Sequence, residues 1–543
     1  MSVEDGKKFN LDLLIQQIGP FGKFQLLNYL LICLPIAMTA MYTLTFVFTA
    51  GDLDYRCRIP GCDEGESPSL DAPFLDFTTP KDGDKFSSCE KFLHVPNATV
   101  TDQCQADLFN PNQRRSCSEF VYQDDETTIL SEWDLGCSEE WKLSLVGTIN
   151  NVGQLVCLPM TGYFSDRFGR RTAFILGSIF AASFGLVRSF STSYIMFIIF
   201  EFLEPALSAG VYSAGFILGM ELVGPERRVL GAFFINVFYA LGEALLGLLA
   251  MFTRDWRLLM QVAYVPTFLF ILYRWLIPES ARWLVNMNRT RSAAKIIDRA
   301  ARMNKSPLTA DAKKMLDDAL QKNVETEEKS EKLKAEEPIV KEYRLMAALK
   351  SRTLLLRLIN CSYCWIAICF VFYGMSMNSV TVAGDKYLNF ILTCLIEIPG
   401  AGICCLFMDR IGRRPMLCIS LILSGASCIA FIFLSDLPEA AQLTVFLIGK
   451  LNISMSFITI YVYTAELFPT ELRHTLLATC SMFGRIGSIL APFTPLLGKY
   501  VESLPMILFA SLAISSGVFI MFAPETFNKT LPDTLQEAED IGT

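Results

Sequence analysis

Histidine and charged side chains are scarce in this chain of 543 residues. It contains two histidines, His94 and His474, against 42 Phe, and 19% of its residues are charged while 52% are apolar. So few histidines exclude a His-rich metal centre and a two-His zinc motif. A soluble protein of this length needs far more polar surface to cover its cores. The composition therefore predicts a membrane protein.

Several signatures of other functions are also missing. The sequence has no P-loop, no G-x-S-x-G motif, no Ser–His pair and no basic stripe with interleaved aromatic residues. These absences argue against an enzyme and against nucleic-acid binding. We predict that the protein binds no cofactor and no metal. We expect it to lie in the lipid bilayer.

The net charge of −8 is unevenly distributed along the chain. Residues 50–141 contain 7 Lys and Arg against 20 Asp and Glu, so the rest of the chain is net basic. Cytoplasmic loops of membrane proteins carry an excess of Lys and Arg. The distribution therefore predicts that the acidic segment lies outside the cell and the basic loops inside.

The same acidic segment has six of the 17 cysteines. Six Cys in a stretch rich in Pro, Gly and Asp predict three disulfides in an oxidising compartment, and all 15 pairings stay open. The sequon that begins at Asn97 predicts a glycan there. The disulfide candidates are Cys57, Cys62, Cys89, Cys104, Cys117 and Cys137.

Twelve apolar runs are long enough to cross the hydrocarbon core, which takes about 20 residues per helix. We expect them at residues 24–48, 143–164, 172–190, 194–222, 229–252, 258–277, 353–376, 383–408, 416–434, 443–463, 475–497 and 505–522. The expected organisation is a cytoplasmic N-terminus (1–23), a first half (24–285), a charged cytoplasmic linker (286–350), a second half (351–523) and a cytoplasmic C-terminus (524–543).

An internal repeat relates the two halves. Three motifs recur at nearly one spacing, of 243 to 246 residues, and each follows an even-numbered span. The pairs are DRFGRR (166–171) with DRIGRR (409–414), EL-PE-R (221–228) with EL-P-E-R (466–473), and PES (278–280) with PET (524–526). Two homologous six-helix halves of this kind predict the major facilitator arrangement, an all-α polytopic fold.

Charged side chains inside the spans are the candidates for function, because they are costly in lipid. Arg485 lies ten residues into its span, roughly 15 Å deep at ~1.5 Å per residue. Glu397 and Lys450 are similarly central. The alternative is that these charges pair with each other and only hold helices together.

The other charges in the spans lie at different depths in the membrane. Glu204 is central and is a candidate for substrate binding, whereas Glu201 and Glu243 lie nearer the outside. All three acids are expected to face a wet vestibule. Arg188 lies near a helix end and is expected to extend its charged group to the interface.

With these motifs and the large Cys-bearing loop after the first span, the sequence resembles the organic cation, organic anion and carnitine transporter family of the major facilitator superfamily. The segment LIEIPGA (395–401) is similar to the cation branch, in which an acid at this point is implicated in cation handling. CSMFGRIG (480–487) is similar to the anion and carnitine branches, which have an Arg where cation carriers have an Asp. One cavity with both groups suits a substrate that has an amine and a carboxylate.

The resemblance also implies roles for aromatic and motif residues. Rings in the cavity stabilise amines by ~0.5–2 kcal/mol each, although most aromatics in such a chain are packing residues. The candidates are Tyr212, Trp365, Phe372 and Tyr373. Charge pairs at the cytoplasmic helix ends would form in the outward-facing state and break on inward opening. The gating candidates are Asp166, Arg170, Glu221, Asp409, Arg413 and Glu466.

The sequence thus predicts a plasma-membrane carrier of small amine-bearing cations or zwitterions of the carnitine, β-alanine or amino-acid-conjugate type. An organic anion exchanger that uses Arg485 and Lys450 is the alternative within transport. A non-transporting ligand receptor is the alternative from another class. No residue pattern decides between sodium and proton coupling.

Overall fold

The computed structural model describes residues 19, 21–64, 69–82, 85–95, 104–123, 125–223, 228–287, 289–306, 350–434, 437–469, 472–529, 532 and 534–541. Asn97 and most of the expected linker lie outside these residues.

Within the described residues, twelve helical segments are long and apolar enough to cross a membrane, which confirms the prediction. They are Lys23–Thr49, Cys137–Phe168, Arg170–Arg188, Tyr194–Leu222, Leu230–Thr253, Trp256–Leu276, Arg352–Thr381, Lys386–Ile411, Arg413–Ile432, Glu439–Leu467, Thr475–Tyr500 and Leu504–Met521.

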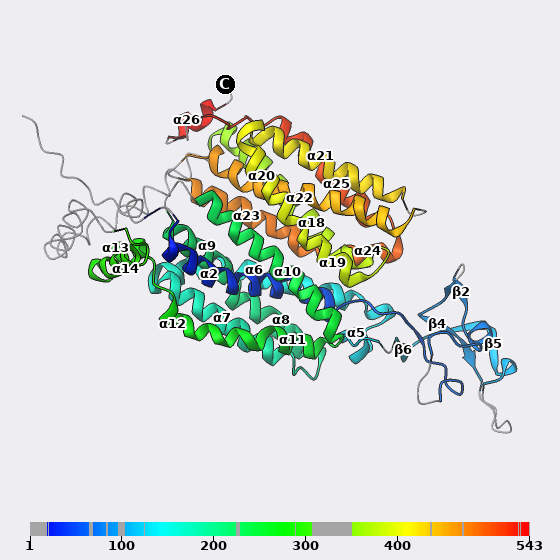
Figure 1. The fold of residues 1–543 in the computed structure, drawn as a ribbon. Helices are drawn as coiled ribbons and strands as arrows, with labels where there is room; N and C mark the ends of the chain where they lie inside the picture. Colours follow the sequence, from blue (N-terminus) through cyan, green and yellow to red (C-terminus); the bar gives the residue numbers. More distant parts are fainter. Residues whose placement is uncertain are drawn as a thin grey trace, which may run out of the picture.

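The first six spans form one bundle, coloured blue to green in Figure 1. Its helices are α2 (Lys23–Thr43), α3 (Phe46–Thr49), α6 (Trp141–Phe168), α7 (Arg170–Arg188), α8 (Tyr194–Ser208), α9 (Gly210–Leu222), α10 (Arg228–Thr253), α11 (Trp256–Tyr264), η4 (Val265–Leu272) and α12 (Tyr273–Leu276). Two short helices follow, α13 (Ala281–Asn286) and α14 (Thr290–Met303).

The last six spans form the second bundle, yellow to red in Figure 1. Its helices are α18 (Arg352–Asn378), η5 (Ser379–Thr381), α19 (Lys386–Leu395), α20 (Glu397–Ile411), α21 (Arg413–Ile432), α22 (Glu439–Leu467), α23 (Arg473–Leu490), η6 (Ala491–Phe493), α24 (Thr494–Tyr500), α25 (Leu504–Met521) and α26 (Leu535–Asp540). The eighth span is divided at Ile396. Pro399 lies one turn further and cannot donate a hydrogen bond to the carbonyl of Leu395, which favours a break there.

The acidic segment folds between α3 and α6 as short strands held by disulfides. Its elements are β1 (Tyr55–Cys57), α4 (Leu75–Thr78), β2 (Lys81–Asp82), β3 (Lys85–Phe86), β4 (Glu90–His94), η1 (Ala106–Leu108), β5 (Phe109–Ser116), β6 (Phe120–Tyr122), α5 (Ile129–Glu132) and η2 (Cys137–Glu139). They make three two-stranded antiparallel sheets, β1–β6, β2–β3 and β4–β5. The six candidate cysteines pair as Cys57–Cys117, Cys62–Cys104 and Cys89–Cys137.

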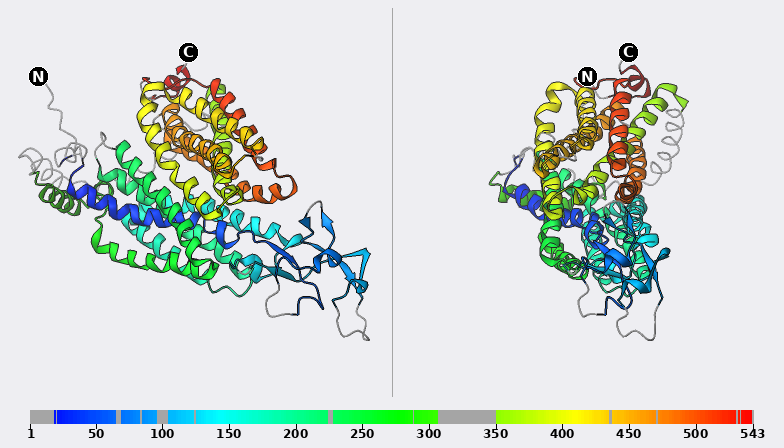
Figure 2. Two further views of the ribbon diagram at one scale, coloured as in Figure 1. Left: turned by 45° about the vertical axis from the view of Figure 1, so that its right-hand side comes forward. Right: turned by 90° about the vertical axis from the view of Figure 1, so that its right-hand side faces the viewer.

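The two bundles contact each other mainly at the end that has these strands, here called the disulfide end. There α10 packs against α19 and α20, and α6 packs against α23 and η6. The opposite end, which has the repeated DR-x-GRR motifs, is called the motif end. In Figure 2 the bundles meet near the strands and diverge towards the motif end. The arrangement is therefore closed at one end and spread at the other.

Candidate functional site

Arg485 lies where the two bundles face each other. It is on α23, it is partly exposed, and its guanidinium donates a 3.0 Å hydrogen bond to the side-chain oxygen of Gln154 on α6. Its other close polar neighbours include Tyr373, Tyr461 and Tyr239, from both bundles. No carboxylate pairs with Arg485 among the described residues. A carboxylate ligand could therefore replace the neutral amide as its partner.

Gln154 begins a chain of hydrogen bonds that leads into the first bundle. Its amide nitrogen donates to Asn150 at 2.9 Å, and Asn150 donates to a carboxylate oxygen of Glu201 at 2.8 Å. Glu201 forms an ion pair with Arg188, whose guanidinium also donates to the Tyr264 hydroxyl at 2.9 Å. The chain connects the facing surface to a buried ion pair on α7 and α8.

The position of Arg188 corrects one expectation. Its side chain was expected to reach the interface, but it is 1% exposed and fully enclosed between helices. The reason is Glu201, which supplies the opposite charge on the neighbouring helix and makes burial tolerable. The expectation that Glu201, Glu204 and Glu243 face a wet vestibule is also wrong, because all three are buried. Glu204 accepts a hydrogen bond from Ser208 at 2.8 Å.

In the second bundle, Lys450 and Glu397 form an ion pair at 2.8 Å. The ammonium also donates to the Ser376 hydroxyl at 2.8 Å and to the Phe372 carbonyl at 3.2 Å. It lies 3.4 Å from the centroid of the Phe372 ring, within cation–π range. Lys450 is fully buried, while the Glu397 side chain is 12% exposed. The pairing alternative considered from the sequence therefore describes Lys450 well.

The predicted aromatic residues fall into two sets. Tyr212 is partly exposed and meets Tyr239 edge-to-face, with ring centroids 5.5 Å apart. Trp365, Phe372 and Tyr373 are buried on α18. Within that set, the indole of Trp365 donates to Thr464 at 3.0 Å, which is a packing role. The structure therefore brings Tyr212 and Tyr373 near Arg485. Trp365 instead packs against Tyr461 and Gly484.

Sequence reasoning missed several residues of this surface. Tyr239 and Tyr461 lie near Arg485, and Gln154 binds it directly. Gln154 had a readable signal, because polar residues at Asn150, Asn151 and Gln154 are costly in an apolar span and usually bind a neighbouring helix. The two tyrosines had none, because aromatic residues make up 12% of this chain and most of them pack in the spans.

The repeated motifs at the motif end form matching contacts in the two bundles. Arg170 pairs with Asp166, and Arg413 pairs with Asp409 at 2.9 Å, each one helical turn apart. Arg413 also pairs with Glu466 at 3.0 Å. In the described part of the chain Glu221 has no such pair with Arg170, and one of its carboxylate oxygens lacks a hydrogen-bond partner. These ion pairs join helices within one bundle, and their gating role stays a prediction.

Two further acids, Glu279 and Glu525, bind the backbone of the same turns. Glu279 accepts a hydrogen bond from the backbone of Arg171 at 3.0 Å, and Glu525 accepts from the backbone of Arg413 and Arg414 at 3.1 Å. Gly169, with φ of 105°, lies against the Glu279 carboxylate, and a Cβ there would be 2.4 Å from its oxygen. The PES and PET motifs therefore cap the helices that follow the DR-x-GRR turns.

Ion pairs also connect the two bundles at the disulfide end. Lys499 on α24 pairs with Asp52 at 2.8 Å and with Glu140 at 3.1 Å. Lys386 pairs with Glu126. Burial raises the pKa of Asp52, and Lys499 opposes that shift. Since these side chains are partly exposed, each pair contributes little to stability, about 0–1 kcal/mol.

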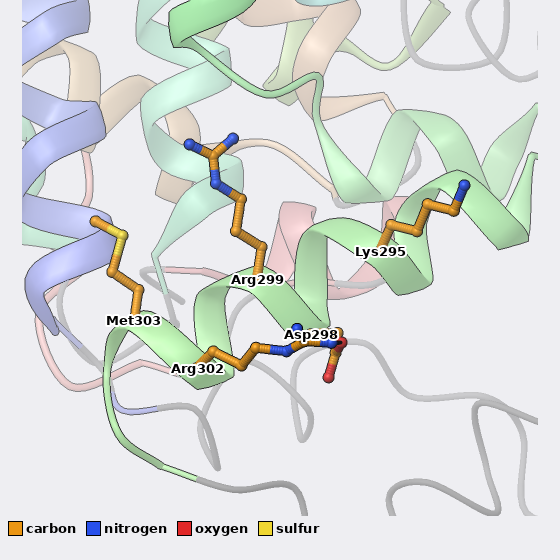
Figure 3. Close-up of a pocket in the computed structure, with 5 residues that line it drawn as sticks. All are labelled: Lys295, Asp298, Arg299, Arg302 and Met303. Carbon is orange, nitrogen blue, oxygen red and sulfur yellow. Dashed lines mark hydrogen bonds and ion pairs between the residues drawn. The ribbon is translucent and has the colours of Figure 1, made fainter.

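A separate surface hollow lies on α14, away from the charges in the spans. It has a volume of about 480 Å³ and is lined by Lys295, Asp298, Arg299, Arg302 and Met303 (Figure 3). Arg302 pairs with Asp298 one turn away. The charges of this hollow lie on the solvent-facing side of one short helix, so we do not assign it to the site.

The fold and the paired halves define a membrane transporter of the major facilitator class. Residues 128–492 and 388–539 match the family described as Major Facilitator Superfamily. The xylose transporter XylE from E. coli, in a partially occluded inward-open conformation, has the same fold, with a TM-score of 0.60, 14% identity and coverage of 93% of this chain and 100% of that one.

Curated relatives narrow this assignment. The chain is 30% identical to the organic cation transporter protein of Drosophila melanogaster, over 98% of this chain and 95% of that one. It is 30% identical to solute carrier family 22 member 3 of Mus musculus (98% and 96%) and 29% identical to organic cation/carnitine transporter 2 of Rattus norvegicus (96% and 92%). The chain belongs to solute carrier family 22, which confirms the predicted resemblance.

Proposed function

We propose that this protein is a plasma-membrane carrier of small organic ions that have both an amine and a carboxylate. The observation on which the proposal depends is Arg485, a cation between the two bundles whose hydrogen-bond partner is the neutral Gln154. Relatives are named for organic cations and for carnitine, and carnitine is itself a zwitterion. Substrates of the carnitine, β-alanine or amino-acid-conjugate type fit this chemistry.

The carboxylate of the substrate binds Arg485 in this proposal. A guanidinium offers two parallel N–H donors to a carboxylate of opposite charge, whereas the neutral Gln154 oxygen accepts one bond from it. Exchange of the Gln154 amide for a carboxylate therefore favours the bound state. A purely cationic substrate meets Arg485 unfavourably.

The amine of the substrate lies against the aromatic side chains near Arg485. Tyr212, Tyr239 and Tyr461 offer ring faces and hydroxyl oxygens, both of which attract an ammonium group. Glu397 adds a negative charge that is slightly exposed, although Lys450 already neutralises most of it. We assign Lys450 to holding Glu397 and the Phe372 ring in place.

Transport proceeds by alternating access between the two bundles. We place the disulfide end outside the cell and the motif end in the cytoplasm, because the disulfide end is acidic and has the cystines. The contacts at the disulfide end then close the external path in the conformation described. The charged turns at the motif end are the candidates for closing the internal path.

Uptake into proteoliposomes or cells tests the proposal. We expect labelled carnitine-like and β-amino-acid compounds to enter, tetraalkylammonium ions to enter more slowly and dicarboxylates not to compete. Uptake of dicarboxylates alone would reject the zwitterion assignment. Ligand binding without flux in proteoliposomes would support a receptor instead.

Organic anion exchange is the second candidate, and one observation favours it. Lys450 neutralises Glu397, so Arg485 is the charged group between the bundles that lacks an opposite charge among the described residues. In an exchanger, dicarboxylates loaded inside the vesicles accelerate uptake of labelled anions. In a zwitterion carrier they do not.

A further inference from the structure

Glu243 is a buried acid that the proposed transport site does not use. It lies on α10, is 0% exposed, and neither of its carboxylate oxygens has an N–H or O–H donor within the described residues. The thiol of Cys394, which belongs to the other bundle, lies beside it and is a weak donor. An ionised carboxylate in such surroundings costs several kcal/mol.

The nearest cation cannot satisfy this acid. Lys450 faces Glu243, but its ammonium already has three oxygen neighbours, from Glu397, Ser376 and the Phe372 carbonyl. Its charge is paired with Glu397, and it donates hydrogen bonds to Ser376 and to the Phe372 carbonyl. With both acids ionised, two negative charges would share one positive charge. A proton on Glu243 removes this imbalance.

Among the described residues, Lys450 is the one cation that acts on Glu243. Tyr239 on the same helix and Tyr373 on α18 are its phenolic neighbours, and Thr43 on α2 bonds to Tyr239. On the adjoining helices, Tyr212 of α9 meets Tyr239, Tyr264 of α11 binds Arg188, and Arg257 of α11 pairs with Glu132.

The burial of Glu243 depends on contact between the two bundles. One turn further along α10, a Cβ on Gly247 would lie 2.8 Å from Ile391 and 2.9 Å from Phe390 of α19. So close an approach leaves no room for water beside the carboxylate. When the bundles separate at the disulfide end, the surface of α10 that has Glu243 comes into contact with water from that side.

We infer that Glu243 is a proton-binding site and that closure of the disulfide end takes up one proton. An O–H bond forms on the carboxylate as α10 closes against α19 and α20, and the proton returns to the same aqueous side on reopening. No other bond changes. Acid at the disulfide end therefore favours the closed conformation. This inference goes beyond the proposed function and does not depend on which ion is carried.

Thiol labelling at the closed contact tests the inference without substrate. Ile391→Cys places a reporter opposite Gly247, and a membrane-impermeant maleimide reaches it only when the disulfide end opens. We expect the labelling rate to fall by up to about tenfold per pH unit on acidification, which is the dependence on one proton. The exposed reporter Tyr500→Cys corrects for thiol ionisation, and the chain without a reporter gives the background.

Substitution of Glu243 gives the decisive comparison. Glu243→Gln, which imitates the protonated acid, should keep labelling slow and make it change by less than about twofold across the same pH range. Glu243→Asp retains a titrating group and should keep the pH dependence, which shows that the reporter still works in a substituted chain. Glu502→Gln, at an exposed position of the same end, should also keep it.

Two outcomes would overturn the inference. One is labelling that does not depend on pH in the unsubstituted chain. The other is a pH dependence that survives Glu243→Gln but disappears in Asp52→Asn, which would assign the proton to the ion pair with Lys499. Because no substrate is present, failure of the uptake panel rejects the proposed function alone, and these outcomes reject the inference alone.

Discussion

At the scale of single residues, the charges in the spans differ in how far their neighbours satisfy them. Arg188 and Lys450 are enclosed by opposite charges and hydrogen-bond acceptors, whereas Arg485 has a neutral amide and Glu243 has a thiol. A buried charge with its partner holds helices together, and a charge without one is available for a ligand or a proton. This difference, rather than depth in the membrane, is why we propose functions for Arg485 and Glu243.

Arg485→Asp should reverse the substrate preference. Loss of the guanidinium removes a charge-assisted bond worth about 1.5–3 kcal/mol, so uptake of carboxylate-bearing substrates should fall by about 10- to 100-fold. Purely cationic substrates should be relatively favoured. Competition between labelled carnitine-like and tetraalkylammonium compounds measures the ratio. Arg299→Gln on the surface of α14 is the control, and an unchanged ratio in Arg485→Asp would make Arg485 structural.

Arg188→Met should destabilise the first bundle strongly. It leaves Glu201 buried without its cation, and removal of one partner of a buried ion pair costs about 3–5 kcal/mol. Thermal unfolding of the purified protein in detergent measures the loss. The double substitution Arg188→Met with Glu201→Met should recover much of it, because no charge is left unpaired. A double variant as unstable as the single one would contradict this explanation.

At the scale of elements, the two acids of the PES and PET motifs explain how the charged turns are held. Glu279 accepts from one backbone N–H group at the start of α7, and Glu525 accepts from two at the start of α21. The first four N–H groups of a helix lack partners within the helix. The motif is therefore a helix cap supplied from a distant point of the chain.

Glu525→Ala should lower stability more than Glu279→Ala. Glu525 accepts backbone hydrogen bonds from Arg413, Arg414, Thr526 and Phe527, whereas Glu279 accepts from Arg171 and Ser280. Loss of a helix cap costs about 0.5–2 kcal/mol. Melting temperatures of the two variants give the order, with Glu439→Ala on an exposed helix start as the control. Equal losses would show that the additional bonds of Glu525 add nothing.

At the scale of the whole molecule, the two bundles repeat one arrangement of six spans and differ in the charged residues inside them. The fold was predictable because apolar runs of sufficient length and the spacing of DRFGRR and DRIGRR are direct readings of the sequence. The partners of Arg188 and Lys450 were not predictable from the sequence, because the rotation of each helix about its axis decides which side chains of different spans meet. The disulfide pairing was also not predictable, because the spacing of six cysteines does not show which strands bring which pair together.

A cross-link between the bundles should stop transport. Gly247→Cys with Ile391→Cys places two thiols at the close contact of α10 and α19. Oxidation should join them, hold the disulfide end closed and abolish uptake, and mild reduction should restore it. Each single variant, treated in the same way, is the control. Full uptake by an oxidised, cross-linked protein would mean that the bundles do not separate at this contact.

The bond between Arg485 and Gln154 has a consequence for the empty carrier. Its donor is charged and its acceptor is neutral, and a hydrogen bond to a charged group contributes about 1.5–3 kcal/mol. The partly exposed ion pairs of Lys499 add little more. Without a substrate, the polar bonds between the bundles are therefore few, and the packing of α10 against α19 and α20 accounts for the rest of the contact. For the proposed carrier we predict that the empty form changes conformation without a return substrate, so uptake into vesicles should not require substrate inside them.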